Sequence, residues 1–171
     1  MSEKRREMIL KILSGQSTPV SGSDLARDLG VSRQVIVQDV AILRAKGHRI
    51  IATPQGYLFP QKQSTNQAVL AVRHFRQDTE DELNIMVDHG LKVIDVIVEH
   101  PLYGEMRGCL MMDSRQDVKR FLKELDSEGA TLLSSLTGGV HLHTVEYDRR
   151  EDLEEARQAL RSRGLLAVDD I

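Results

Sequence analysis

The spacing of apolar residues over the first third of the chain predicts three short helices followed by a two-stranded hairpin. Apolar residues recur with the helical period between residues 8 and 13, which predicts the first helix. A second helix is predicted over residues 21–30 and a third over residues 33–47, with a tight turn at Gly30 between them. Residues 49–59, RIIATPQGYLF, then predict a strand, a Pro-Gln-Gly turn and a second strand. This order is typical of a helix-turn-helix followed by a wing.

Beyond a polar, proline-containing linker at residues 59–67, the pattern alternates between strands and helices. Strands are predicted over 68–75, 92–100, 104–112, 130–137 and 139–147, and helices over 79–90, 114–129 and 150–164. The resulting order, β-α-β-β-α-β-β-α, implies an open-faced antiparallel sandwich with its helices on one face. We therefore predict the α+β class and two domains, residues 1–62 and residues 63–171.

The composition, with 40% hydrophobic and 29% charged residues, is that of a globular protein able to bury a core. No apolar run approaches the ~20 residues that cross a membrane. The N-terminal MSEKRREMILKIL also lacks the apolar core of a signal peptide. The single cysteine, Cys109, excludes an internal disulfide. We therefore expect a cytoplasmic protein with no membrane association.

Charge is distributed unevenly between the two predicted domains. Residues 1–62 carry ten Lys and Arg against five Asp and Glu, a net charge of +5. The remaining 13 basic and 21 acidic residues give the rest of the chain a net charge of −8. A basic domain joined to an acidic one indicates that only the first domain binds a polyanion.

The predicted third helix carries side chains suited to reading DNA. Arginine can bond guanine through two donors, and glutamine can bond adenine in a similar way. For any one residue an ordinary solvated helix face is a serious alternative, but turn, capped helix, wing and local charge agree on DNA. The segment SGSDLARDLGVSRQVIVQDVAILRAKG resembles the winged helix-turn-helix of biotin-ligase-type repressors. The candidate contacts to double-stranded operator DNA are Ser32, Arg33, Gln34, Gln38, Arg49 and Gln55.

Two histidines, His141 and His143, share one face of a predicted strand, because residues two apart on a strand point the same way. This spacing suits metal chelation, although an exposed polar face is the more frequent explanation. Candidate partners are His74, at the end of the first strand of this domain, and Glu82, just inside the following helix. A competing interpretation of Glu82 is a capping box with Thr79, in which the carboxylate reaches back to a backbone amide.

From Ala71 onward the chain resembles the three-histidine (3H) domain, and the whole chain is similar to the niacin-responsive repressors of NAD biosynthesis and niacin uptake. The motifs that carry the resemblance are VRHF, VIDVIVEHPLYGEMRG and GGVHLHTVE. The resemblance implies a fold like that of histidine-containing phosphocarrier proteins. It also implies one divalent transition metal per chain, held by His74, Glu82, His141 and His143. Three imidazoles and one carboxylate suit Ni²⁺, Zn²⁺ or Fe²⁺ better than Ca²⁺ or Mg²⁺.

The resemblance further implies nicotinic acid as the co-repressor, with the metal anchoring its pyridine nitrogen or its carboxylate. His100, Arg73 and Arg107 are candidates for the surrounding ligand pocket. Such a ligand promotes repression only if it binds the DNA-competent arrangement more tightly than the other. One winged helix covers about one half-site, so we expect a homodimer on an inverted repeat, joined through the acidic second domain.

Two other functions fit parts of the pattern. In a metal sensor the ion itself would be the signal, and nicotinate would have no effect on DNA binding. A metal hydrolase would need an open metal position and a nearby general base, for which Glu99 and Glu105 are the available carboxylates. Neither lies in a recognisable catalytic motif, so we expect no enzymatic activity.

Overall fold

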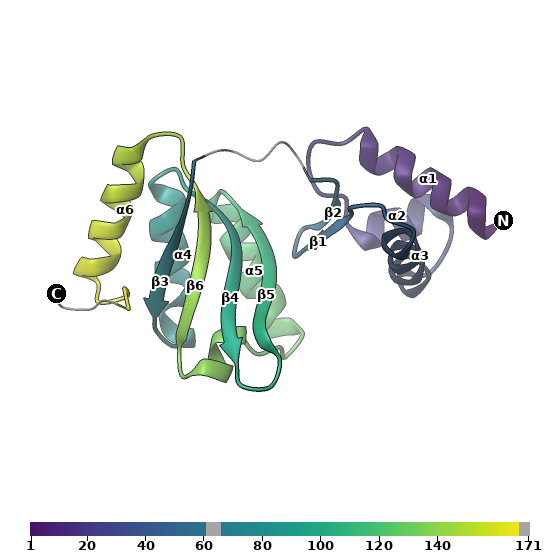
Figure 1. Ribbon diagram of the computed structural model, residues 1–171. Coiled ribbons are helices and arrows are strands. Elements are labelled where there is room, and N and C mark those ends of the chain that lie inside the picture. Colours follow the sequence, from purple (N-terminus) through teal and green to yellow (C-terminus); the bar gives the residue numbers. More distant parts are fainter. Residues whose placement is uncertain (61–65, 168–171) are drawn as a thin grey trace. The chain divides into compact units, whose positions relative to one another are not determined.

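The computed structural model describes residues 1–60 and 66–167 (Figure 1). The chain divides into two compact units, Met1–Gln63 and Ser64–Ile171. The predicted boundary between residues 62 and 63 lies outside the described residues. No helix in the described ranges is long and apolar enough to cross a membrane.

The N-terminal unit has the predicted order of three helices and a short hairpin. Its elements are α1 (Ser2–Ser14), α2 (Gly22–Leu29), α3 (Arg33–Ala45), β1 (Ile51–Thr53) and β2 (Gly56–Leu58). Buried apolar side chains from all three helices form one core, and Ile9, Leu25 and Ile36 are fully enclosed in it. The amphipathic spacing that predicted the helices therefore also predicted most of the core, although Met8 of the predicted first helix is exposed.

Local chemistry explains the turn between α2 and α3. Gly30 ends α2 in the left-handed conformation at φ 68°, which a residue without a Cβ adopts at little cost. Ser32 then caps α3, because its Oγ accepts the amide hydrogen of Val35 at 3.3 Å. Two backbone hydrogen bonds between Val20 and Tyr57 tie the segment before α2 to the wing. The helix-turn-helix and the wing thus form one unit.

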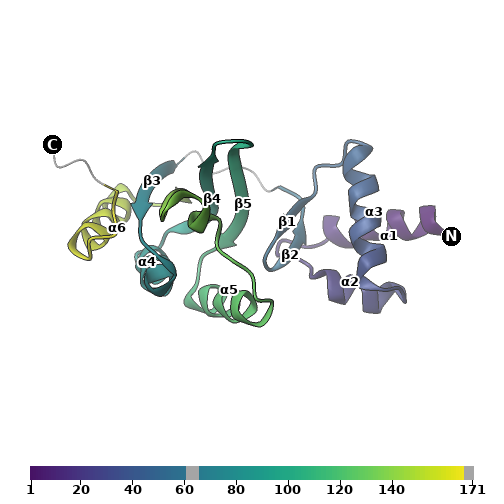
Figure 2. The same ribbon diagram turned by 90° about the horizontal axis from the view of Figure 1, so that it is seen from below.

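The second unit is a four-stranded antiparallel sheet, within the described residues, with the strand order β3-β6-β4-β5. Its strands are β3 (Gln67–Arg73), β4 (Lys92–His100), β5 (Gly104–Met112) and β6 (Val140–Glu146). Its helices are α4 (Thr79–Asp88), α5 (Arg115–Ser127) and α6 (Arg150–Ser162), with the short 3-10 helices η1 (Arg76–Asp78) and η2 (Leu133–Thr137). Figure 2 shows α4 and α5 on the same face of the sheet.

One apolar core lies between the sheet and its three helices. Val72 and Val145 contribute from the sheet, and Leu83, Val118 and Leu153 contribute from α4, α5 and α6. The α+β class and the open-faced arrangement are therefore confirmed. The last residues that the structure describes, Leu165 to Ala167, pair with β3, where Leu165 accepts from the Arg73 amide.

One predicted strand is wrong. Residues 130–137 lie in a loop that ends in η2, so the observed order is β-α-β-β-α-β-α. The hydroxyl of Ser135 donates to the Leu132 carbonyl at 2.7 Å, and that of Thr137 donates to the Ser134 carbonyl at 3.2 Å. Such local side-chain hydrogen bonds give the backbone an alternative to a sheet ladder.

The two glycines that follow η2 do not join two strands in a hairpin, as strands predicted over residues 130–137 and 139–147 would require. Gly138 ends η2 in the left-handed conformation. Gly139 has φ 92° and lies so close to β3 that a Cβ there would be 2.6 Å from the His74 carbonyl oxygen. Glycine is required at this point because the backbones preceding β6 and following β3 touch.

Candidate metal centre

Four buried side chains, from β6, from α4 and from the residue after β3, meet between the sheet and α4. His141 and His143 lie on the inner face of β6, opposite Val72 and Leu70 of β3. His74 directly follows β3, and Glu82 lies in the first turn of α4. All four are at most 5% exposed. The imidazole rings stand edge to face, with centroids 4.8 Å apart for His74 and His141 and 4.9 Å apart for His141 and His143.

The backbone fixes the orientation of each imidazole through a carbonyl oxygen. The Nδ1 atoms of His74, His141 and His143 lie 2.8, 2.9 and 2.7 Å from carbonyl oxygens. The three carbonyls belong to Phe75, Gly139 and Asp95, in that order. Because a carbonyl oxygen can only accept, each Nδ1 must carry the proton and donate it. In the neutral imidazole, Nε2 is then left with a lone pair.

All three Nε2 atoms face the carboxylate of Glu82. His74 Nε2 contacts Oε2, and His141 Nε2 lies 3.2 Å from Oε1. His143 Nε2 lies 2.6 Å from the same Oε1 but without hydrogen-bond geometry, so this buried nitrogen has no hydrogen-bond partner among the described residues. Lone pairs on three nitrogens and a carboxylate repel one another unless a cation lies among them.

In the absence of a metal, protons take the place of that cation. Burial by itself lowers the pKa of His74 and of His143, but attraction to the Glu82 carboxylate outweighs burial and raises both pKa values. Burial by itself raises the pKa of Glu82, but the charge of His143 and the hydrogen bonds of His141 and His74 hold that pKa well below its usual range. The cluster therefore attracts positive charge strongly.

The donor set also fits a transition metal. Ligand atoms of His74, Glu82 and His141 all lie within 4.8 Å of one another, and the unpartnered Nε2 of His143 adds a fourth donor. Neutral imidazole nitrogen is a preferred ligand of Zn²⁺, Ni²⁺ and Fe²⁺, and the carbonyls bonded to Nδ1 orient the rings as the outer shells of metal sites do.

The capping-box interpretation of Glu82 is wrong. The residue before α4, Asp78, makes no side-chain capping bond, and the hydroxyl of Thr79 has no hydrogen-bond partner among the residues described. The Glu82 carboxylate turns toward the imidazoles, where it contacts three Nε2 atoms. A capping box would give this buried carboxylate only one backbone amide as a partner.

The predicted pocket residues lie outside this cluster. His100 stabilises the β4–β5 turn, where its Nδ1 accepts the amide hydrogens of Leu102 and Tyr103 at 3.1 and 3.2 Å. Arg107 lies 3.3 Å from the buried carboxylate of Asp95. The carbonyl of that aspartate orients His143, so Arg107 is connected to the cluster without joining it. Arg73 is exposed on β3.

Comparison with known proteins agrees with this architecture. Residues 67–169 match the family model described as the 3H domain, and residues 5–58 match one described as an HTH domain. The chain belongs to the 3H-domain family of transcription repressors. It is 42% identical to the probable transcription repressor NiaR of Thermotoga maritima over 164 residues, 96% of this chain and 94% of the relative.

A second relative of this 3H-domain repressor is the transcription repressor NadR of Bacillus subtilis. The two are 40% identical over 173 residues, which cover 99% of this chain and 96% of the relative. Both relatives are named as repressors, and this confirms the prediction that the chain is not an enzyme.

In the DNA-binding unit of this repressor, the predicted contact residues occupy the outer side of α3 and the wing. Ser32, Arg33, Gln34, Gln38 and Arg49 are exposed, as DNA contact requires. Gln55 is half-buried, and its side-chain oxygen is enclosed without a hydrogen-bond partner in the described structure.

The inner side of α3 holds a residue that sequence reasoning missed. Asp39 is buried and accepts hydrogen bonds from Arg5 of α1 at 2.5 and 3.2 Å and from Arg6 at 3.4 Å. Its charge at an inward position of an apolar stripe was the available signal, because a buried acid needs a partner. These ion pairs fix the recognition helix to α1.

Proposed function

We propose that the protein represses genes of NAD biosynthesis or niacin uptake, with nicotinic acid as its co-repressor. The supporting observation is the buried Glu82 carboxylate surrounded by three Nε2 atoms, which matches the metal site implied by the resemblance to niacin-responsive repressors. The named relatives are repressors, and the match with this chain covers nearly their whole length. A repressor of this kind acts in the cytoplasm, where its operator and its metabolite are both present.

One divalent ion of nickel, zinc or iron per chain is the proposed cofactor, held by His74, Glu82, His141 and His143. When bound, the ion supplies a Lewis acid for the pyridine nitrogen or carboxylate of the co-repressor. The protein supplies the rest: the Phe75, Gly139 and Asp95 carbonyls keep the imidazoles oriented, and the fixed charge of Glu82 retains the cation.

The protein should bind its operator as a homodimer. One winged helix reaches about one half-site, so a two-fold dimer reads an inverted repeat. The second unit is the proposed contact, since Val69 and Val140 are exposed on the uncovered face of its sheet. Light scattering should give the mass of two chains at concentrations that saturate the operator. A monomer there would contradict this part of the proposal.

Calorimetry tests the co-repressor. Nicotinate titrated into the metal-loaded protein should bind with one site per chain, nicotinamide should bind more weakly, and nicotinate should tighten operator binding in the same buffer. Protein stripped of metal by a chelator is the matched control and should lose the response. Operator binding that never responds to nicotinate would refute the proposal.

A metal sensor remains the second candidate because of one observation. The four proposed ligands are at most 5% exposed, which is the enclosure expected when the ion itself is the signal. Metal should then switch DNA binding on alone, and nicotinate should add nothing. The titration above distinguishes the two functions directly.

A further inference from the structure

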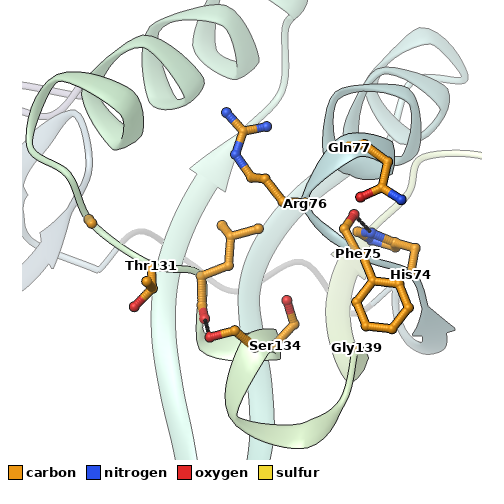
Figure 3. Close-up of a pocket in the computed structure, with 10 residues that line it drawn as sticks. His74, Phe75, Arg76, Gln77, Thr131, Ser134 and Gly139 are labelled. Carbon is orange, nitrogen blue, oxygen red and sulfur yellow. Dashed lines mark hydrogen bonds between the residues drawn. The ribbon is translucent and has the colours of Figure 1, made fainter.

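Two of the hollows lined by described residues reach the residues proposed to hold the metal. One, of about 320 Å³, touches His74 and lies between residues 74–77 and the loop of residues 130–135 (Figure 3). The other, of about 460 Å³, touches His141 and lies over the ends of β4, β5 and β6. Each is of the size that takes a small organic ligand. We call them the His74 hollow and the His141 hollow.

Charge distinguishes the two hollows. The His141 hollow is lined by two carboxylates, Glu99 and Glu105, and by no Lys or Arg among the described residues. The His74 hollow has the opposite character, with the guanidinium of Arg76 and no carboxylate in its described lining. A carboxylate ligand is repelled by the first and attracted by the second.

The remaining lining of the His74 hollow suits one aromatic ring. Phe75 is 58% exposed and, with Leu132 opposite, provides apolar surface on both walls. Thr131, Ser134 and Gln77 add polar groups around that surface. Figure 3 shows Phe75 and Arg76 on one side of the hollow and Thr131 and Ser134 on the other. An aromatic face, a cation and a few polar groups together are a recognition set for an aromatic carboxylate.

The walls of the His74 hollow also orient two imidazoles of the cluster. The Phe75 carbonyl accepts from His74 Nδ1, and the Gly139 carbonyl accepts from His141 Nδ1. The Gly139 amide in turn donates to the Ser134 carbonyl at 2.9 Å. A ligand between these walls therefore touches the backbone that positions the proposed metal ligands.

We infer that the His74 hollow binds a small aromatic carboxylate, with Arg76 as the carboxylate anchor and Phe75 as the stacking face. This inference rests on the proposed function and names the residues that recognise its co-repressor. It replaces Arg73 and Arg107, which line neither hollow.

The carboxylate of Asp126 competes with the ligand for the guanidinium of Arg76. Its Nη2 lies 2.8 Å from the carboxylate of Asp126 on α5, and both side chains are largely exposed. An exposed pair of this kind contributes little to stability. Replacing either residue should therefore leave the fold intact and change ligand binding in opposite directions.

The test is nicotinate and nicotinamide calorimetry on the metal-loaded, full-length protein. Arg76→Gln should weaken nicotinate binding ~10-fold or more while leaving nicotinamide binding nearly unchanged, because only nicotinate carries the charge that Arg76 meets. Asp126→Asn should tighten nicotinate binding by roughly 2- to 5-fold, since it frees the guanidinium. Arg73→Gln is the matched control and should bind as the wild type does.

Three results would overturn the inference. Nicotinate affinity unchanged in Arg76→Gln, with binding by the wild type intact, refutes the His74 hollow and leaves the proposed function standing. An equal loss for nicotinate and nicotinamide in Arg76→Gln refutes the role of Arg76 as an anchor. Absence of nicotinate binding by the metal-loaded wild type refutes the proposed function together with the inference. Equal metal content in all variants shows that the metal site is preserved.

Discussion

Asp39 in the DNA-binding unit and Glu82 in the 3H unit are both buried carboxylates, but different groups compensate their charges. Asp39, 2% exposed, is bonded by the guanidinium groups of Arg5 and Arg6, which are always charged in proteins. Glu82, 1% exposed, meets three imidazoles that can be neutral and whose Nδ1 protons already go to carbonyls.

The difference separates a structural cluster from a binding site. The Asp39 cluster needs no further cation, because the buried carboxylate already faces two guanidinium groups that stay charged. The Glu82 cluster lacks positive charge unless protons or a metal ion supply it. Buried acids of similar exposure therefore differ in role: Asp39 fixes α3 to α1, and we propose that Glu82 holds a cation.

Removing one imidazole from the Glu82 cluster is the change with the largest expected effect, and that effect is on metal affinity. His143→Ala deletes a proposed metal ligand and should lower metal affinity ~100-fold or more, since even partners outside the ligand shell change affinity 10- to 100-fold. Metal content of the purified variant, measured by mass spectrometry, checks this. Asp39→Asn is the matched control and should retain the metal. A His143→Ala protein with full metal content would remove His143 from the site.

Substitutions on the outer side of α3 should weaken operator binding and should not change the Asp39 and Glu82 clusters. Arg33→Ala and Gln34→Ala should each weaken operator binding by ~1–3 kcal/mol and barely change binding to random DNA. Fluorescence anisotropy with the two kinds of duplex measures both affinities. Equal losses on operator and random DNA would mean that these residues contact only phosphates. Unchanged metal content is expected in both variants.

Lowering the pH should affect the Glu82 cluster and leave the Asp39 cluster unchanged, because only imidazoles titrate near neutral pH. The raised pKa values of His74 and His143 mean that protons compete with the metal even above pH ~6.5, the ordinary histidine value. Metal affinity should therefore fall by about tenfold per pH unit as pH drops through this range. Glu82 stays ionised there, because its pKa is lowered. Affinity that is flat from pH 8 to pH 5.5 would contradict proton competition.

The same pKa shifts predict how the stability of the metal-free protein changes with pH. A histidine whose pKa is raised by folding stabilises the fold at low pH, and that contribution is lost as pH rises through the folded-state pKa. The metal-free 3H unit should therefore lose stability as pH rises above about 6.5, the ordinary histidine value. The increase in melting temperature caused by metal should grow over the same interval. Thermal melts with and without chelator measure the difference.

The smallest expected effect comes from Asp39→Asn. The amide keeps the shape but leaves two guanidinium groups without their anion, so the N-terminal unit should melt roughly 4–8 °C lower. Calorimetry of the full-length protein resolves this transition, and lower protection of the α3 amides from hydrogen exchange localises it. A melting temperature equal to the wild-type value would show that the Asp39 cluster does not stabilise α3.

Much of this architecture follows from patterns that are local in the chain. Helical periodicity and the turn signal at Gly30 predicted the helix-turn-helix, and alternation predicted four of the strands, because each signal acts over a few residues. The loop of residues 130–137 was mistaken for a strand, since hydroxyl-to-carbonyl bonds there compete with a sheet ladder. The grouping of His74 and Glu82 with His141 and His143 was predicted from the family resemblance more than from the spacing of the residues.

The features that sequence reasoning missed depend on contacts between distant residues. Asp39 and Arg5 are 34 positions apart, and no local pattern connects them. The carbonyl of Asp95 reaches His143 across 48 positions. Glu82 had a complete local explanation in the capping box, and the tertiary contacts with the imidazoles overrode it.

X-ray absorption at the metal edge, combined with elemental analysis, tests most directly whether the Glu82 cluster holds a metal. We predict one nickel, zinc or iron ion per chain, with three imidazole nitrogens and a carboxylate oxygen in its ligand shell. Glu82→Gln should lose most of the metal, because an amide is a poor ligand. Wild-type protein that stays metal-free when supplied with each ion, with nitrogen NMR showing protons on Nε2 at neutral pH, would contradict this prediction.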